Sequence, residues 1–272
     1  MLETALAFLA GLLIGSFLNV CIFRLPRDLS VVRPRSFCPG CEKTIAWYDN
    51  IPLVSYIALR ARCRLCGERI PLRYPLVELA TGVAFAVCVA ALGVSLAAMT
   101  YSIFSAILIT LIACDLEERI LPDEFTLGGL AIGLVLSAFV PLDSGFAYLL
   151  LPLSVGLRWK SVGESVLGAG MAGGMLWLVG WTYEKLRHRE GLGLGDVKMV
   201  AMIGAFLGLK FALLTLITAS LMGSAGGLIY IFVTRKDAST YELPFGSFLG
   251  MAALAVAMFG KVAIVWYSRL GT

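Results

Sequence analysis

The sequence predicts an all-α protein that crosses a membrane several times and carries one small polar lobe. Hydrophobic residues make up 59% of the chain and charged residues 15%, and the mean hydropathy is +0.89. A soluble domain of this length needs more polar surface than this composition supplies. Stretches long enough to cross a bilayer, about 20 apolar residues each, recur along the chain. These observations exclude a soluble globular protein.

Eight apolar segments predict about eight transmembrane helices. They cover residues 2–23, 76–93, 96–114, 125–141, 162–183, 197–209, 211–233 and 245–267. The first segment is expected to be a retained helix, because Glu3 replaces the usual basic start and no small-residue cleavage site follows. The sixth is short for a full crossing, which predicts a helix that is tilted, kinked or buried among its neighbours.

Basic residues decide whether the apolar residues 145–157 form another span. If they crossed the membrane, the basic cluster from Lys185 to Arg189 would lie outside, together with Asp196. If they form a loop, the cytoplasmic side contains that cluster, Arg235 and Lys236. This arrangement satisfies the positive-inside rule. The sequence therefore predicts eight spans with both termini outside.

One long polar segment interrupts the apolar ones. Between Arg24 and Arg73 lie ten of the 22 basic residues and only four acidic ones. A basic segment tethered to a membrane is typical of a cytoplasmic loop that meets anionic lipid headgroups, so nucleic acid is not expected as a partner. The predicted organisation is a first transmembrane helix (1–24), a cytoplasmic lobe (25–75) and a transmembrane domain (76–272).

Two pairs of cysteines in the lobe have the spacing of zinc knuckles. Cys38 and Cys41 form one pair, Cys63 and Cys66 the other, and 21 residues separate the pairs. Two thiolates from each pair complete a tetrahedral site that leaves no open position for water. Disulfides or unrelated thiols are the alternatives, and a reducing cytoplasm disfavours disulfides. The pattern predicts a structural Zn²⁺ that stabilises a lobe with little core.

Two aspartates lie at the edges of predicted transmembrane segments. Asp115 ends the apolar run from Leu96, and Asp196 closes a glycine-rich stretch that begins at Gly191. Alone, Asp115 fits a helix-end carboxylate among headgroups, and Asp196 fits a helix N-cap. In the predicted topology, however, both lie at the same cytoplasmic depth, and acidic groups at membrane depth indicate function.

Two close carboxylates suit the chemistry of an aspartyl protease. They share one proton, because like charges a few ångströms apart resist joint ionisation. One carboxylate then activates a water while the protonated one polarises the scissile carbonyl. The pair titrates as a unit, so neither is assigned as acid or base. The single histidine, His188, lies in a basic run and gives little support to a His-dependent nucleophile.

Short motifs run in order along nearly the whole chain. They are Gly15–Val20 (GSFLNV), Arg24-Leu25-Pro26, both cysteine pairs, Trp47–Pro52 (WYDNIP), Arg73-Tyr74-Pro75 with Glu78, Asp115 with Leu121-Pro122, Gly193–Lys198 (GLGDVK) and Pro244-Phe245-Gly246. In this ordered set the chain resembles the type IV prepilin peptidases, the bifunctional leader peptidases and N-methyltransferases of bacterial inner membranes. The G-x-G-D-x-K block with an upstream aspartate is typical of this aspartyl protease class.

The resemblance implies that Asp115 and Asp196 are the catalytic pair, facing the cytoplasm. The implied substrates are type IV prepilins or type II secretion pseudopilins, and the implied second reaction methylates the new N-terminus with S-adenosylmethionine. The cysteine lobe is similar to that of the bifunctional bacterial form. In one departure, Ala61 stands where the family often has glycine, in the lobe linked with methylation. No Rossmann pattern marks a site for S-adenosylmethionine, so no residues are assigned to it.

Two other classes of function fit part of the sequence. A membrane-embedded assembly factor of a pilus or secretion system would use the zinc lobe to bind a partner without catalysis. It would tolerate loss of the aspartates and fail when Cys38 or Cys63 is replaced. A transporter would use the acids along an ion path, but it leaves the cysteines unexplained.

The remaining polar motif residues have structural interpretations. Asp123 and Glu124 are expected at a helix start, and Asn19, Glu78 and Lys198 are expected to make polar contacts between helices or with headgroups.

Overall fold

The computed structural model describes residues 1–142, 145–152, 154–187, 193–234 and 244–270, and in these residues it confirms the all-α fold. Five of the described helices are long and apolar enough to cross a membrane. They lie within Leu2–Arg27, Arg73–Leu92, Leu96–Glu118, Leu157–Arg187 and Leu194–Tyr230. The chain divides into two compact units, Met1–Glu118 and Arg119–Thr272, which are described separately.

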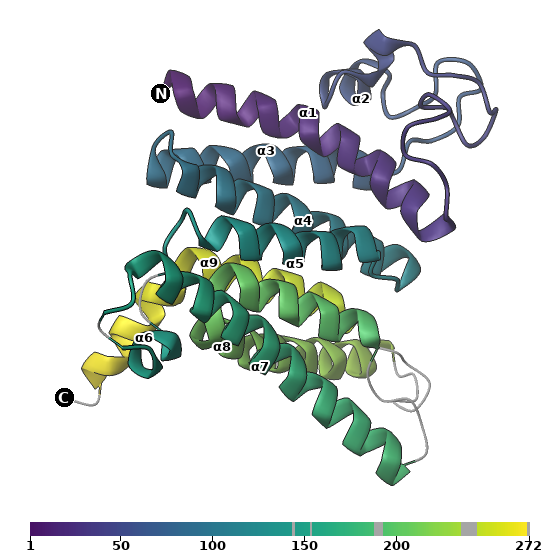
Figure 1. The fold of residues 1–272 in the computed structure, drawn as a ribbon. Coiled ribbons are helices and arrows are strands. Elements are labelled where there is room, and N and C mark those ends of the chain that lie inside the picture. The colour runs from purple at the N-terminus through teal and green to yellow at the C-terminus, as the bar shows by residue number, and fades with distance from the viewer. Residues whose placement is uncertain (143–144, 153, 188–192, 235–243, 271–272) are drawn as a thin grey trace. The chain divides into compact units, whose positions relative to one another are not determined.

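Three long helices form the first unit. Helices α1 (Leu2–Arg24), α3 (Arg73–Leu92) and α4 (Leu96–Glu118) lie side by side (Figure 1). Two glycines, one turn apart on α1, bring α1 and α3 together. A Cβ atom on Gly11 would lie 2.7 Å from the Cα of Gly82, and one on Gly15 would lie 2.7 Å from the Cα of Glu78. This spacing of small residues allows helix backbones to approach closely in lipid.

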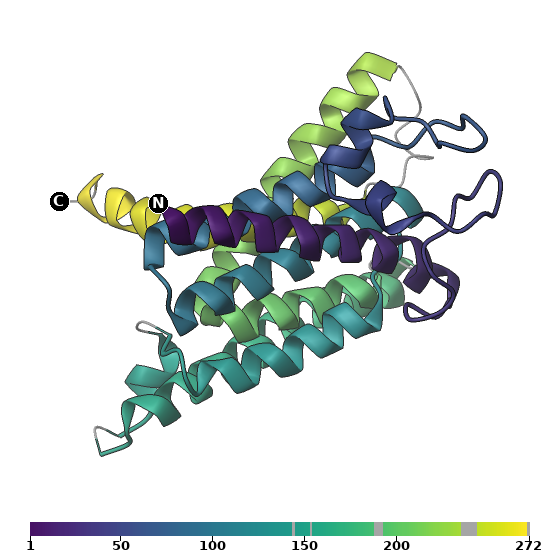
Figure 2. The same ribbon diagram turned by 90° about the horizontal axis from the view of Figure 1, so that it is seen from above.

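The polar lobe connects α1 to α3 and contains only short helices. These are η1 (Leu25–Arg27), η2 (Trp47–Asn50) and α2 (Val54–Ala58). In Figure 2 its loops extend from the C-terminal end of α1. The buried side chain of Arg24 donates hydrogen bonds to the carbonyl oxygens of Ser30 (2.9 Å) and Pro34 (2.8 Å). The first part of the lobe is thereby held against the last turn of α1.

The second unit is built around two long helices that touch through glycines. It contains α5 (Asp123–Ser137), α6 (Phe146–Leu150), α7 (Leu157–Arg187), α8 (Leu194–Thr234) and α9 (Phe245–Leu270). A Cβ atom on Gly204 of α8 would lie 2.3 Å from the carbonyl oxygen of Gly168 on α7. Next to this contact, the Ser165 hydroxyl donates a 2.6 Å hydrogen bond to the carbonyl of Ala205. Close backbone packing thus fixes α7 against α8.

A kink divides α8 at Gly208, whose backbone angles are φ 76° and ψ 171°. The buried carboxylate of Glu164 accepts a 3.0 Å hydrogen bond from the N–H of Leu209, just beyond the kink. Its other oxygen accepts a 2.9 Å hydrogen bond from the N–H of Ala147. Inside a membrane, a broken helix is tolerated where such groups satisfy the freed backbone. The predicted sixth and seventh segments are therefore the two arms of one kinked helix.

The other predicted segments each coincide with one helix, and the predicted loop at 145–157 is also supported. Within it, α6 spans only five residues, too few to cross a bilayer. The number of crossings, the side on which the termini lie and the three-part domain division stay predictions. Part of the charge pattern behind the topology, at His188, Arg189, Arg235 and Lys236, lies outside the described residues.

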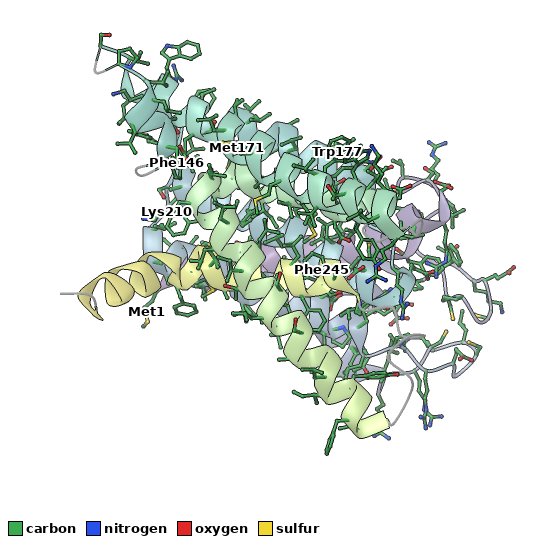
Figure 3. The ribbon with its side chains drawn as sticks, turned by 90° about the horizontal axis from the view of Figure 1, so that it is seen from below. Met1, Phe146, Met171, Trp177, Lys210 and Phe245 are labelled. Atoms are coloured by element: carbon green, nitrogen blue, oxygen red, sulfur yellow. The ribbon has the colours of Figure 1, made fainter. Side chains whose placement is uncertain are left out.

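The outward face of α7 is apolar. Met171 and Trp177, labelled in Figure 3, are both exposed. Trp177 stacks on Trp181, and the Lys185 ammonium lies 4.7 Å from the Trp181 ring centre. Exposed apolar side chains that end in aromatic and then basic residues are typical of a helix that meets lipid and then the membrane interface.

Replacing Gly11 by alanine tests the α1–α3 contact. The added methyl group would strike the backbone of Gly82, so we expect Gly11→Ala to destabilise the protein by about 1–3 kcal/mol. Thermal unfolding of the purified protein in detergent measures the effect. The matched control is Gly174→Ala on α7, where no atom lies within 4 Å of the new Cβ. Equal melting temperatures for the two variants would contradict close packing at Gly11.

Candidate functional site

The four cysteines of the lobe lie together, as predicted from their spacing. All four Sγ atoms lie within 4.8 Å of one another. The Sγ atoms of Cys38 and Cys66 are 3.7 Å apart, and a tetrahedral site with Zn–S bonds of about 2.3 Å places its sulfurs ~3.8 Å apart. The cluster of Cys38, Cys41, Cys63 and Cys66 can therefore hold one metal ion. Cys21, Cys88 and Cys114 lie on the transmembrane helices.

Both cysteine pairs sit in the same kind of backbone turn. In the first, the N–H of Cys38 donates to the carbonyl of Lys43 (3.0 Å), and in the second the N–H of Cys63 donates to Glu68 (2.8 Å). An antiparallel bridge flanks each turn, Phe37 with Thr44 and Arg62 with Arg69. The lobe thus contains two copies of the same knuckle, and each copy contributes two thiols to the four-cysteine cluster.

Each knuckle also needs a left-handed residue directly after its second cysteine. Glu42 has φ 55° and Gly67 has φ 74°. Glycine adopts this conformation freely, whereas a residue with a Cβ is strained there. The N–H of each of these residues donates to the carbonyl of the first cysteine of its own pair. The left-handed residue therefore closes the turn that brings the two thiols together.

The backbone of the second knuckle favours a thiolate. Hydrogen bonds from the N–H groups of Cys66 and Leu65 lower the pKa of the Cys63 thiol to about 7. Although the N–H of Glu68 favours its thiolate, burial and the neighbouring cysteine thiols raise the pKa of Cys66 to about 12, so only one thiol of the pair is favoured as a thiolate before metal binds. Deprotonated thiols are the form that binds metal. Four such ligands make a closed coordination shell, which suits a structural ion rather than a catalytic one.

Arg64 ties the second knuckle to helix η2. Its Nε and Nη2 atoms donate to the two carboxylate oxygens of Asp49 at 2.8 and 2.6 Å. The Arg64 side chain keeps the pKa of the Asp49 carboxyl below its usual range. An exposed pair contributes little stability, but its two-pronged geometry fixes the orientation of the knuckle.

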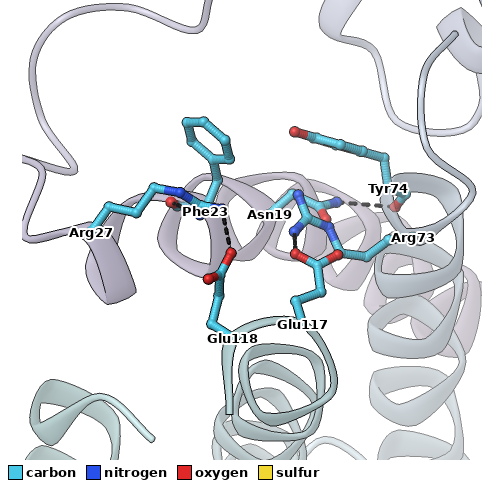
Figure 4. A network of polar contacts seen from close by, with 7 residues as sticks. All are labelled: Asn19, Phe23, Arg27, Arg73, Tyr74, Glu117 and Glu118. Carbon is cyan, nitrogen blue, oxygen red and sulfur yellow. Dashed lines mark hydrogen bonds and ion pairs between the residues drawn. The ribbon is translucent and has the colours of Figure 1, made fainter. Parts of the chain in front are cut away.

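Asp115 is buried near the end of α4, in a turn held by two arginines. Glu117 binds Nη1 of Arg73, and Glu118 binds Nη2 of Arg27, as Figure 4 shows. The positive charges also lie at the C-terminal end of α4, where the helix dipole favours them. The helix end that carries Asp115 is thereby anchored to α1 and α3.

Asp196 lies half-buried in the first turn of α8, and its neighbours hold that turn against the start of α5. A Cβ atom on Gly195 would lie 3.1 Å from the Cβ of Leu121, so the glycine permits close contact. Lys198 Nζ donates to both carboxylate oxygens of Asp123, at 2.7 and 2.8 Å. The predicted G-x-G-D-x-K block therefore works as a connection between two helix starts. Gly191, where the glycine-rich stretch begins, lies outside the described residues.

The two aspartates belong to different compact units, so their pairing stays a prediction. The helix-start interpretation of Asp123 is confirmed, because α5 begins there. Two expected polar contacts are also present in the first unit. Asn19 Nδ2 donates to the carbonyl of Tyr74 (3.0 Å), and Glu78 Oε2 accepts from the N–H of Leu53 (2.8 Å).

The first unit contains a cavity that was not predicted from the sequence. It has a volume of about 760 Å³ and lies between α1, the start of α3 and the lobe. Its wall combines residues from Ser16 to Glu117, which only the fold brings together. Three polar residues from separate sequence motifs line the cavity: Asn19, Arg73 and Glu78. Their presence in these motifs was the only feature of the sequence that pointed to a shared site.

The fold and the four-thiol cluster define a multi-pass membrane protein with a metal-binding lobe, and comparison with known proteins narrows this class. Residues 9–92 match the bacterial peptidase A24 N-terminal domain, and residues 102–228 match the type IV leader peptidase family. The chain belongs to this family. No solved structure matches the chain.

The similar curated proteins are prepilin leader peptidase/N-methyltransferases. The protein from Myxococcus xanthus (strain DK1622) is 41% identical over 84% of this chain, and the chain spans 63% of the length of that relative. The proteins from Pseudomonas putida and Aeromonas salmonicida are 32% and 33% identical, over 96% and 97% of this chain and 90% and 93% of their own length. These findings confirm the family and the enzyme class expected from the motifs. Together with the apolar helices they indicate a multi-pass protein of the inner membrane.

A double-mutant cycle tests the contact between Lys198 and Asp123. If the ion pair joins the starts of α5 and α8, Lys198→Met and Asp123→Asn should each lower the melting temperature, and the double variant should add little to either. A half-exposed pair of this kind is worth about 0.2–1 kcal/mol. Lys210→Met, at an exposed lysine of α8, is the control. Fully additive losses would show that the two side chains act independently.

Proposed function

We propose that this chain removes the leader peptide of type IV prepilins or type II secretion pseudopilins and then methylates the new N-terminus. The observation that carries the proposal is the presence, in order, of the bacterial N-terminal domain and the leader peptidase domain. The relatives named for both activities align over most of the chain, and this supports both halves.

For cleavage, the proposed catalytic pair is Asp115 and Asp196. One carboxylate takes a proton from water, whose oxygen attacks the scissile carbonyl carbon, while the other, protonated, donates to the carbonyl oxygen. The C–N bond then breaks, and the leaving amine takes up a proton. Burial of Asp115 and the anchored helix ends around both residues support roles that require fixed carboxylates.

For methylation, the acceptor is the α-amine freed by cleavage. The neutral amine attacks the methyl carbon of S-adenosylmethionine, a C–N bond forms as the C–S bond breaks, and the amine loses a proton. S-adenosylhomocysteine is the second product. This half of the proposal rests on the N-methyltransferase activity for which the relatives are named. Ala61, which is not one of the four clustered cysteines, is the residue of the lobe that departs from the family pattern.

The lobe is proposed to hold a structural Zn²⁺ at its four cysteines. Thiolate-only sites of this geometry favour zinc, and the short helices of the lobe enclose little core.

The active site is proposed to face the cytoplasm. Lys185 and Arg187 end α7, and Asp196 follows in the first turn of α8. Under the positive-inside rule this end of both helices is cytoplasmic. Prepilins, pseudopilins and membrane lipids are the proposed partners.

Changing either aspartate to asparagine tests the peptidase. With a co-expressed prepilin, we expect Asp115→Asn and Asp196→Asn each to lower cleavage by about 100-fold or more, because asparagine cannot exchange the proton. Mass measurement of the product N-terminus reads cleavage and methylation together. Asp28→Asn, at an exposed aspartate, is the matched control. Normal cleavage by both variants would rule out the aspartyl mechanism.

Metal analysis tests the zinc site. Purified, reduced protein should contain about one zinc per chain, because the four thiolates form one tetrahedral site. Cys63→Ser should lose most of the metal and lower the melting temperature, whereas Cys88→Ser, a change on α3, should retain the metal. Wild-type protein without zinc, or Cys63→Ser with full zinc content, would contradict the assignment.

A further inference from the structure

Two residues that line the cavity of the first unit each carry a buried polar atom without a hydrogen-bond partner. Asn19 is only 2% exposed, and while its Nδ2 donates to Tyr74, its Oδ1 has no partner. Arg73 binds Glu117 through Nη1, but its Nε is buried and unpartnered. Figure 4 shows the two side chains next to each other, from α1 and the start of α3. A buried unsatisfied polar group costs about 1–3 kcal/mol, so each such group requires an explanation.

Glu78 adds a buried carboxylate to the same wall. It is 8% exposed, and its hydrogen bonds come from two neutral groups, the N–H of Leu53 and the hydroxyl of Ser16. Among the described residues, no arginine or lysine forms a salt bridge with it. A carboxylate removed from water without a cation is unfavourable. The wall therefore offers a carboxylate and an amide oxygen to a cation, beside an N–H group suited to an anion.

Aromatic side chains make up another part of the cavity wall. Tyr48, Tyr56 and Tyr74 line it, and the Arg73 guanidinium lies 4.6 Å from the ring centre of Tyr74. Rings of this kind accept a flat heterocycle and attract cations to their faces. The volume of about 760 Å³ falls within the usual range of small-molecule sites, roughly 300–1,000 Å³.

We propose that this cavity is the site for S-adenosylmethionine, an inference that rests on the methyltransferase half of the proposed function. The methyl donor carries a sulfonium and an ammonium cation, a carboxylate and an adenine ring. Glu78 and Asn19 Oδ1 suit the cations, Arg73 Nε suits the carboxylate, and the tyrosines suit the ring. The wall thereby carries a group complementary to each of these parts of the ligand.

A cleaved peptide is the competing occupant, since its free N-terminal amine is also a cation. An amine alone would satisfy Glu78 and Asn19, but it would leave the Nε of Arg73 without an acceptor. The presence of a donor and acceptors in one wall therefore favours a ligand that carries both charges.

Equilibrium dialysis with methyl-labelled S-adenosylmethionine tests the site on the full-length, zinc-loaded protein in detergent. Wild type should bind one equivalent. Glu78→Gln keeps the size of the side chain and an acceptor for Leu53 but removes the charge, and it should weaken binding by about 10-fold or more. Asn19→Leu should do the same by removing Oδ1. Glu184→Gln, at an exposed glutamate of α7, is the matched control and should bind like wild type.

Photocrosslinking gives a second readout that depends on no variant. Irradiation of the wild-type complex with labelled S-adenosylmethionine, followed by peptide mass spectrometry, should place the label in residues 16–27 or 36–78. Label confined to residues 119–272 would overturn the proposal. The proposal would also be overturned if Glu78→Gln and Asn19→Leu both bound S-adenosylmethionine with wild-type affinity. It would likewise be overturned if these variants bound a cleaved peptide more weakly but bound S-adenosylmethionine normally.

These outcomes separate the inference from the proposed function. If wild type cleaves and methylates a prepilin while the label lies elsewhere, only the location fails. If wild type cleaves but neither binds S-adenosylmethionine nor methylates, the methyltransferase half fails, and this inference fails with it.

Discussion

The close approach of α1 and α3 at Gly11 and Gly15 is the constraint on which the first unit depends. With no room for a Cβ atom at either position, the two backbones meet along one face. Their contact brings Asn19 within hydrogen-bond distance of the Tyr74 carbonyl and sets Arg73 beside it. The same register lets arginines from the end of α1 and the start of α3 hold the acidic end of α4. The cavity, its polar wall and the anchored helix that carries Asp115 all follow from this contact.

Each unit contains a buried glutamate, Glu78 in the first and Glu164 in the second, and the two differ in their hydrogen-bond partners and surroundings. Glu164 is buried, and both of its oxygens accept backbone N–H groups, so the kink at Gly208 accounts for it fully. Glu78 is nearly as buried, but it accepts hydrogen bonds from one backbone N–H and the Ser16 hydroxyl, and it lines a cavity. Glu164 therefore has a structural role at the kink, whereas Glu78 is the carboxylate that we assign to ligand binding.

Periodicity and spacing predicted much of this molecule from sequence. The apolar runs located the long helices, because burial in lipid acts on local composition, and the C-x-x-C spacing located the thiol cluster, because knuckle geometry is also local. The length of the sixth segment allowed a kinked helix to be predicted, but the position of the break at Gly208 was not, since glycine does not itself reveal a positive φ. The Lys198–Asp123 pair and the cavity were missed as assemblies. Their members are far apart in sequence, so no local pattern records that they meet.

The two knuckles of the lobe differ in one residue, and this has a consequence for how the lobe assembles. Gly67 adopts its left-handed conformation without a steric penalty, whereas Glu42 in the equivalent position of the first knuckle costs about 1–2 kcal/mol. The turn of the second knuckle therefore forms at a lower conformational cost than the turn of the first. Holding the first knuckle in its turn therefore depends more on its other contacts, including the metal ion proposed at the four cysteines, than holding the second does.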